Sequence, residues 1–125
     1  MIINNDRIEI LREHNLLRRA FYPNPPDITY FKDDGTICST CFQLRNGENG
    51  ISVDLEHLTK YEISIKDKTK YRLITINAGS IHDLSLLTEH TPLPDNYAHS
   101  LIKGDIDRKK SKKLAGLART VQYLS

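Results

Sequence analysis

The chain has 125 residues, of which 38% are hydrophobic and 27% charged, and a formal net charge of +2. These values are typical of one globular domain that buries a single core without disulfide or metal support. No apolar run approaches the roughly 18 residues that a membrane span needs, and the stretch Met1 to Asp6 lacks the pattern of a signal peptide. We therefore expect one domain over residues 1–125, located in the cytoplasm and without a membrane partner.

The first element that the sequence predicts is a short N-terminal helix. Asp6 and Glu9 have the spacing of a capping box, and apolar residues follow at helical intervals until Asn15. Residues 16–21 either continue this helix or run extended. Three prolines within residues 23–26 then end either structure, because proline fixes φ and removes a hydrogen-bond donor.

Two runs rich in β-branched and aromatic residues come next and predict a hairpin. They span residues 28–31 and 36–44, and the Asp34-Gly35 step between them suits a tight turn. A strand over residues 51–54 follows a second turn at residues 46–50. Asp54 is expected to cap a short helical turn that begins at Leu55.

The second half of the chain predicts three more strands and a helix. The strands cover residues 71–76, 81–87 and 98–102. The C-terminal helix is predicted from an apolar stripe at helical spacing, formed by Leu114, Leu117, Ala118, Val121 and Leu124. The fold class is therefore α+β: a mostly antiparallel sheet of about five strands with helices at both termini.

Positive charge is concentrated in front of the C-terminal stripe. Residues 103–119 carry seven lysines and arginines but only Asp105 and Asp107 as acids, a local excess of five positive charges. Cations in a first helical turn are opposed by the free amides, so an anionic partner would relieve them. The candidate binding residues are Lys103, Arg108, Lys109, Lys110, Lys112 and Lys113. A purely solvated helix face is the alternative interpretation.

His99 is the candidate for chemistry, because it lies where a proline-bounded loop meets a strand. A neutral imidazole there can act as a general base, with Arg18, Arg19 or Lys103 holding a phosphate. The serines at positions 39, 52 and 100 carry no local signature of a nucleophile. A structural hydrogen bond is the alternative role for His99, and ion pairs or aromatic packing are the alternatives for the arginines.

The pair Cys38 and Cys41 forms a C-x-x-C motif, which can bind zinc or exchange disulfides. Alternation along a straight strand would point the two sulfurs to opposite faces, and no second C-x-x-C completes a set of four ligands. We interpret both cysteines as small buried strand residues in a reducing compartment. The sequence therefore predicts no metal and no cofactor.

Four short motifs resemble those of small uncharacterised bacterial proteins, over roughly residues 18 to 120. The motifs are Arg18-Arg19 with a following proline, residues 34–39 with Phe42, Ser52-Val53-Asp54, and Asn96-Tyr97-Ala98-His99. The resemblance implies a prokaryotic origin and no particular fold, activity or ligand.

The sequence thus favours a small intracellular module that binds a polyanion, such as nucleic acid or a nucleotide-bearing complex, through a basic C-terminal helix. One alternative is a metal-independent nuclease or nucleotide-modifying enzyme that uses His99. The other is a protein-interaction subunit whose basic helix contacts an acidic surface. Whether the chain is an enzyme, and whether it forms oligomers through a sheet edge, stay open at this level.

Overall fold

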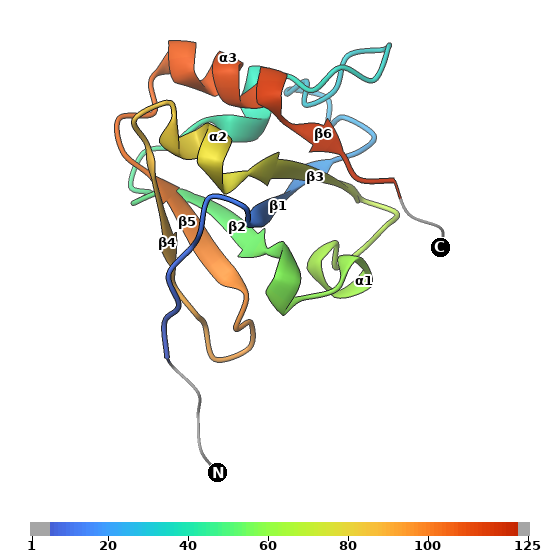
Figure 1. Cartoon of the computed structure of the whole chain (residues 1–125). Coiled ribbons are helices and arrows are strands. Elements are labelled where there is room, and N and C mark those ends of the chain that lie inside the picture. The colour runs from blue at the N-terminus through green and yellow to red at the C-terminus, as the bar shows by residue number, and fades with distance from the viewer. Residues whose placement is uncertain (1–5, 123–125) are drawn as a thin grey trace.

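A twisted antiparallel sheet runs through the centre of the chain (Figure 1). The computed structural model describes residues 6–122, and all elements named below lie in this range. Its six strands lie in the order β4-β5-β2-β1-β3-β6. They are β1 (Asn15–Phe21), β2 (Ile51–Leu55), β3 (Tyr71–Asn77), β4 (Leu87–His90), β5 (His99–Lys103) and β6 (Arg119–Thr120).

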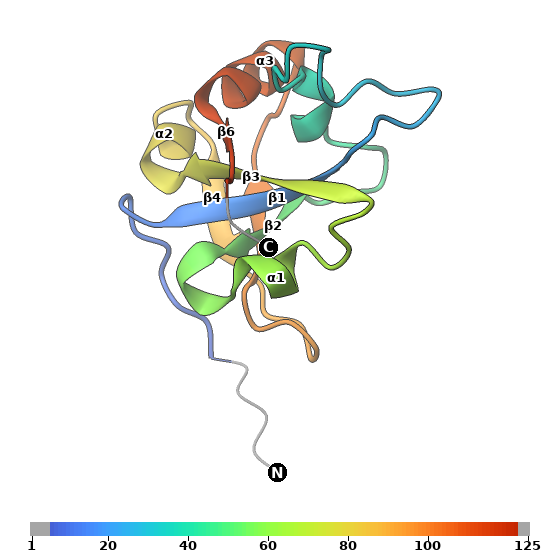
Figure 2. The same cartoon turned by 90° about the vertical axis from the view of Figure 1, so that its right-hand side faces the viewer.

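Short helices cover both sides of this sheet. The α-helices are α1 (Tyr61–Ser64), α2 (Ala78–His82) and α3 (Arg108–Leu117), and the 3-10 helices are η1 (Ser39–Phe42) and η2 (Glu56–Leu58). Both views place α2 and α3 on one side of the sheet and α1 on the other (Figures 1 and 2). Within residues 6–122 no helix has the length and apolar character required to cross a bilayer.

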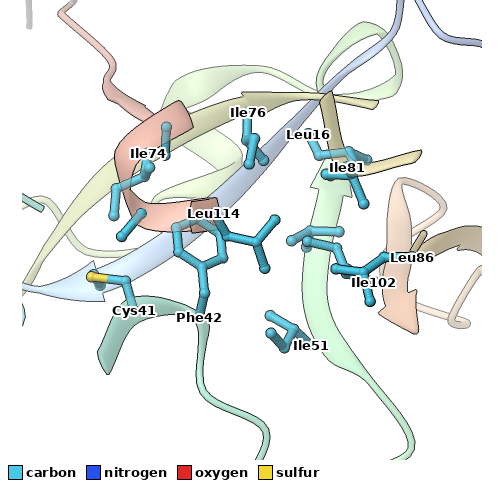
Figure 3. Close-up of a cluster of buried hydrophobic side chains, with 14 of the residues drawn as sticks. Leu16, Cys41, Phe42, Ile51, Ile74, Ile76, Ile81, Leu86, Ile102 and Leu114 are labelled. Atoms are coloured by element: carbon cyan, nitrogen blue, oxygen red, sulfur yellow. The ribbon is translucent and has the colours of Figure 1, made fainter. Parts of the chain in front are cut away.

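The main core lies between the sheet and the layer made by α3 and η1 (Figure 3). Phe42 and Leu114 are completely buried there against apolar side chains of β1, β2, β3 and β5. Ser111 on the buried side of α3 donates a hydrogen bond of 2.7 Å to the carbonyl oxygen of Phe42. This bond ties α3 to η1 and satisfies a hydroxyl that would otherwise be costly to bury.

The α+β class, the antiparallel sheet and the C-terminal helix are confirmed. The strands expected over residues 51–54, 71–76 and 98–102 are present as β2, β3 and β5. Residues 16–21 run extended, as β1. The sheet has six strands where about five were expected, and no pattern in the sequence marks the two-residue strand β6.

The N-terminal helix, in contrast, was a wrong prediction. No helix forms over residues 6–14, where the chain runs irregularly along the sheet edge. The amide of Ile8 donates a 3.0 Å hydrogen bond to Nδ1 of the buried His90, whose Nε2 lies 2.6 Å from the carbonyl oxygen of Tyr97. This bond and the burial of Ile10 in the main core hold the segment against the sheet edge, and these tertiary contacts prevail over the local capping signal.

The expected hairpin over residues 28–44 is reduced to a single bridge between Phe31 and Ile37. The Asn24 side chain accepts hydrogen bonds from the amides of Tyr30 and Phe31 and donates to the carbonyl oxygen of Phe31. These backbone groups are then not available for a longer ladder. The turn itself is present, with Gly35 at a φ of 88°, but the chain beyond it coils into η1.

Two boundaries in the second half also differ from the prediction. Residues 81–87 are not one strand: Asn77 caps α2 by accepting from the amide of Ser80, and only Leu87 of that range lies in β4. The apolar stripe of the C-terminal helix ends at Leu117, after which the chain extends into β6. Val121 therefore lies beyond the helix, and position 124 lies outside the described residues.

Leu114 and Leu117 provide a matched test of this packing. Leu114 is fully buried, whereas Leu117 is 46% exposed. Leu114→Ala is expected to lower the free energy of unfolding by about 2 to 5 kcal/mol, because it leaves a cavity in the core. Leu117→Ala is expected to change it by about 0.5 kcal/mol or less. Chemical denaturation of both variants measures the free energy of unfolding. Equal losses of this free energy would contradict the burial of Leu114 and the exposure of Leu117.

Candidate functional site

The site begins where the neighbouring strands β1 and β2 separate. Leu16 pairs with Leu55 and Leu17 with Asp54, but the two strands pair no further, although β1 continues to pair with β3 along its whole length. The side chain of Arg18 lies in the resulting gap. It donates from Nε to the carbonyl oxygen of Cys41 at 3.0 Å and from Nη1 to that of Ser52 at 2.9 Å.

Burial lowers the pKa of Arg18, and the charge of Glu48 acts in the opposite direction. A guanidinium remains protonated under such shifts, so Arg18 is a fixed positive charge in the wall of the site. One of its two bonds satisfies the Ser52 carbonyl of β2, at a level where β1 and β2 no longer pair, and the other satisfies a carbonyl of the 3-10 helix η1. The arginine thereby keeps the gap open without leaving these backbone acceptors unpaired.

The gap opens into a cavity of about 500 Å³. Its polar lining comes from five segments that are distant in sequence: Arg18, Arg19, Arg45, Glu48, Ser52, Asp54, Lys66, Asp95, Asn96 and His99. The strand register explains this convergence, because Leu17 lies opposite Asp54 and Asp54 opposite His99. Alternation then places Arg19 and Ser52 on the same face of the sheet. A second hollow of about 510 Å³, next to Arg72 and β6, receives none of the predicted site residues.

Asp54 is the buried carboxylate of this face, with only 5% of its surface exposed. It accepts hydrogen bonds from Ser64 Oγ at 2.7 Å and Asn96 Nδ2 at 2.9 Å, and Arg19 Nη1 lies 3.8 Å away. The prediction that Asp54 caps a helical turn was wrong, since the residue before η2 is Leu55 and no side chain caps it. Asp54 instead fixes Asn96 and Arg19 around the cavity.

His99 contacts Thr91 through one ring nitrogen. Its Nδ1 lies 2.9 Å from both the carbonyl oxygen and the Oγ1 of Thr91. We assign the proton to Nδ1, because an unprotonated Nδ1 would place its lone pair against the carbonyl oxygen, which can only accept. In the neutral ring Nε2 then has a free lone pair. Ser52 Oγ lies 3.4 Å from this nitrogen and is its nearest hydrogen-bonding group. The geometry is that of a base beside a hydroxyl, inside a cavity lined by four cationic and three acidic side chains.

The other predicted binding residues lie elsewhere. Lys103 does not line the cavity, and its Nζ is 3.5 Å from Glu89 Oε2. Helix α3, which carries the remaining cations, lies on the opposite side of the sheet from α1 (Figure 2), and Ile63 of α1 and the nearby Lys66 line the cavity. Lys110 is half-buried, whereas Arg108, Lys109, Lys112 and Lys113 are exposed. None of the five takes part in an ion pair between described residues.

A side chain at the N-terminus of α3 caps one of the free amides of the helix. Asp107 accepts a 2.8 Å hydrogen bond from the amide of Lys110 and so acts as the N-cap. Its carboxylate offsets part of the positive end of the helix dipole.

The two cysteines do not form the predicted pair of strand residues, because the chain is helical from Ser39 to Phe42. Cys41 is buried and Cys38 half-buried, and both are free thiols. Burial raises the pKa of Cys41 to about 12, although the Arg18 charge opposes the shift. Within residues 6–122 no group of three or more His, Cys, Asp and Glu side chains is placed to hold a metal ion.

Sequence reasoning identified Arg18, Arg19 and His99 but missed most of their surroundings. Ser52 lacks any local motif of a nucleophile, and Thr91 enters only because its carbonyl oxygen orients His99. Asn96 lies in the same short motif as His99, which is the one sequence signal that could have linked them. Arg45 and Lys66 come from segments whose positions no periodicity specifies.

The raised pKa of Cys41 predicts a thiol of low reactivity. In a Cys38→Ser variant, iodoacetamide should modify native Cys41 about 100-fold or more slowly than the unfolded protein, since the thiol is buried and hardly ionised at neutral pH. Mass spectrometry with and without guanidinium chloride measures the two rates. Rapid modification of the native variant would contradict the burial of this sulfur beside Arg18.

The cavity and the exposed cations of α3 are therefore the two candidate sites of the described chain. The resemblance to small bacterial proteins stays a prediction. Comparison of the chain with protein-family models, with curated proteins and with solved structures finds no match.

Proposed function

We propose that the chain is a metal-independent enzyme that acts on a phosphodiester or nucleotide substrate, with His99 as the general base. The observation that carries this proposal is the orientation of His99, whose Nδ1 contacts Thr91 while its Nε2 lies 3.4 Å from the hydroxyl of Ser52, another residue that lines the cavity. A base must reach the proton that it removes, and Ser52 Oγ marks where a reacting hydroxyl lies.

A negatively charged substrate is supported by the charges around His99. Four cationic side chains line the cavity, namely Arg18, Arg19, Arg45 and Lys66. The acids are Glu48, Asp95 and Asp54, and Asp54 is already engaged by Ser64, Asn96 and Arg19. Arg19 is assigned to the phosphate, because among the described residues only its Nη1 is engaged, by Ser64 and Asp54, and a guanidinium binds phosphate in a forked geometry.

His99→Asn tests the general base while keeping its structural bond. The Asn amide nitrogen occupies the position of Nδ1 and can still donate to Thr91, but no group replaces Nε2. Single-stranded RNA, cyclic AMP and ATP, incubated in EDTA, serve as probes. We expect turnover of at least one of them, lowered about 10²- to 10⁴-fold by His99→Asn with little change in melting temperature.

His82→Gln is the matched control, because His82 lies on α2 outside the cavity and its Nε2 bonds to Thr88. It should leave turnover unchanged. The proposal fails if no probe is converted, if EDTA abolishes the activity, or if His99→Asn is as active as the unaltered protein.

As a second function, we propose that the exposed cations of α3 bind a polyanion, either nucleic acid or an acidic protein surface. It is supported by the absence of ion-pair partners for these cations among the described residues. The Asp107 cap counts against this second function, because its carboxylate already offsets part of the positive end of the helix dipole. Because no array of base-reading side chains lies on α3, contacts to nucleic acid would be mostly to phosphates.

Neutralising three of these cations tests the second function. The variant Lys109→Gln, Lys112→Gln, Lys113→Gln should weaken binding of duplex and single-stranded oligonucleotides. It should also reduce the slope of log K against log salt by about 0.7 to 0.9 for each phosphate that the protein no longer neutralises. Fluorescence anisotropy across a salt series measures both quantities. The control neutralises Lys60, Lys68 and Lys70, which are exposed away from α3. If both variants lose the same oligonucleotide affinity, binding depends only on the net charge of the protein and the α3 site is wrong.

A further inference from the structure

The cavity has an aromatic wall at the end away from His99. Phe21 and Tyr71 line it with ring centroids 5.0 Å apart and ring planes 36° apart, and Tyr30 lies behind Phe21 at 5.9 Å. Phe21 is 41% exposed, although it is the largest apolar residue of β1. An aromatic ring that is left partly open inside a charged cavity is a surface on which a flat group can stack.

The distance between this wall and His99 follows from the strand geometry. Leu17 is in register with Asp54, and Asp54 with His99, so the His99 end of the cavity lies at the level of Leu17. Phe21 is four residues further along β1, which corresponds to about 13 Å along the strand, and β5 with His99 lies two strands away, which adds about 10 Å across the sheet. A ligand that reaches both ends must therefore be elongated, with a flat group at one end and the reacting group at the other.

Arg19 lies between the two ends. Its Cζ is 5.9 Å from the centre of the Tyr71 ring, and its Nη1 is 3.8 Å from Asp54 Oδ2 and donates to the carbonyl oxygen of Ser64 at 2.8 Å. Among the described residues, no hydrogen bond is made by its Nε or Nη2. Nε and Nη2 can therefore donate to a phosphate, while the contacts of Nη1 hold the guanidinium in place.

We propose that Phe21 and Tyr71 form the subsite for a nucleobase, so that a nucleoside phosphate lies along β1 with its base on this wall and its phosphate on Arg19. The proposal rests on the proposed function of the cavity and adds to it the class and the direction of the substrate. Nucleotides join a stacking ring to an anion, which are the two groups that this part of the cavity is built to hold.

Tyr22 offers a matched control for Phe21. It is the next residue in the chain and is also 41% exposed, but it does not line the cavity. Its ring instead packs edge-on against Phe31, and the Arg72 guanidinium lies 3.4 Å from its centre. Substitutions at positions 21 and 22 therefore compare two similar rings, of which only one faces the proposed nucleobase.

The experiment uses two single-tryptophan variants, Phe21→Trp and Tyr22→Trp, since the chain has no tryptophan of its own. AMP should quench the fluorescence of Trp in Phe21→Trp and leave that of Tyr22→Trp unchanged. Calorimetric titration of the unaltered protein should show that AMP binds about 10-fold or more tightly than ribose 5-phosphate, because only AMP can stack. Phe21→Ala should remove this preference, and Tyr22→Ala should keep it.

The outcomes separate the two proposals. If AMP and ribose 5-phosphate bind equally, or if Phe21→Ala leaves the preference intact, the nucleobase subsite is wrong while the phosphate site of the proposed function stands. If AMP binds and quenches Phe21→Trp but His99→Asn leaves turnover unchanged, the subsite stands and the general base is wrong. If neither AMP nor ribose 5-phosphate binds, both proposals are overturned.

Discussion

The separation of β1 from β2 beyond Leu17 is the constraint on which the rest of the site depends. Two neighbouring strands of a sheet normally satisfy each other's backbone, and a gap between them leaves carbonyl groups unpaired. Arg18 resolves this by donating to Ser52 on one strand and to Cys41 on the adjoining 3-10 helix. Hydrogen bonds from a charged donor are each worth about 1.5 to 3 kcal/mol, more than a typical neutral hydrogen bond.

The same gap explains why the polar residues gather where they do. With the strands apart, the side chains of Arg19, Ser52 and His99 face a common space instead of packing against a continuous sheet surface. Asp54 organises this space from within, because both of its oxygens are engaged by neighbouring side chains. A buried carboxylate that is satisfied in this way holds its partners in fixed positions, as a pocket for chemistry requires.

Much of the framework was predictable, and two of the errors share one cause. The strands β2, β3 and β5 and the helix α3 follow from local patterns of apolar residues. These two wrong predictions occur where a side chain from elsewhere takes a backbone group. His90 binds the amide of Ile8 and holds the N-terminal segment at the sheet edge, and Asn24 accepts from the amide of Tyr30, which a hairpin ladder would use. Sequence periodicity contains no information on such partners, because they lie up to 82 residues apart.

The amino-acid sequence by itself determined the α+β class, three strands, the basic C-terminal helix and the choice of Arg18, Arg19 and His99 as candidates. Only the tertiary structure decided that these three residues share a cavity, that Lys103 and the α3 cations lie outside it, and that Ser52 and Thr91 flank His99. The physical reason is that periodicity sets which face of an element a residue occupies. Strand register and the position of the gap set which faces meet, and both depend on pairing between distant segments.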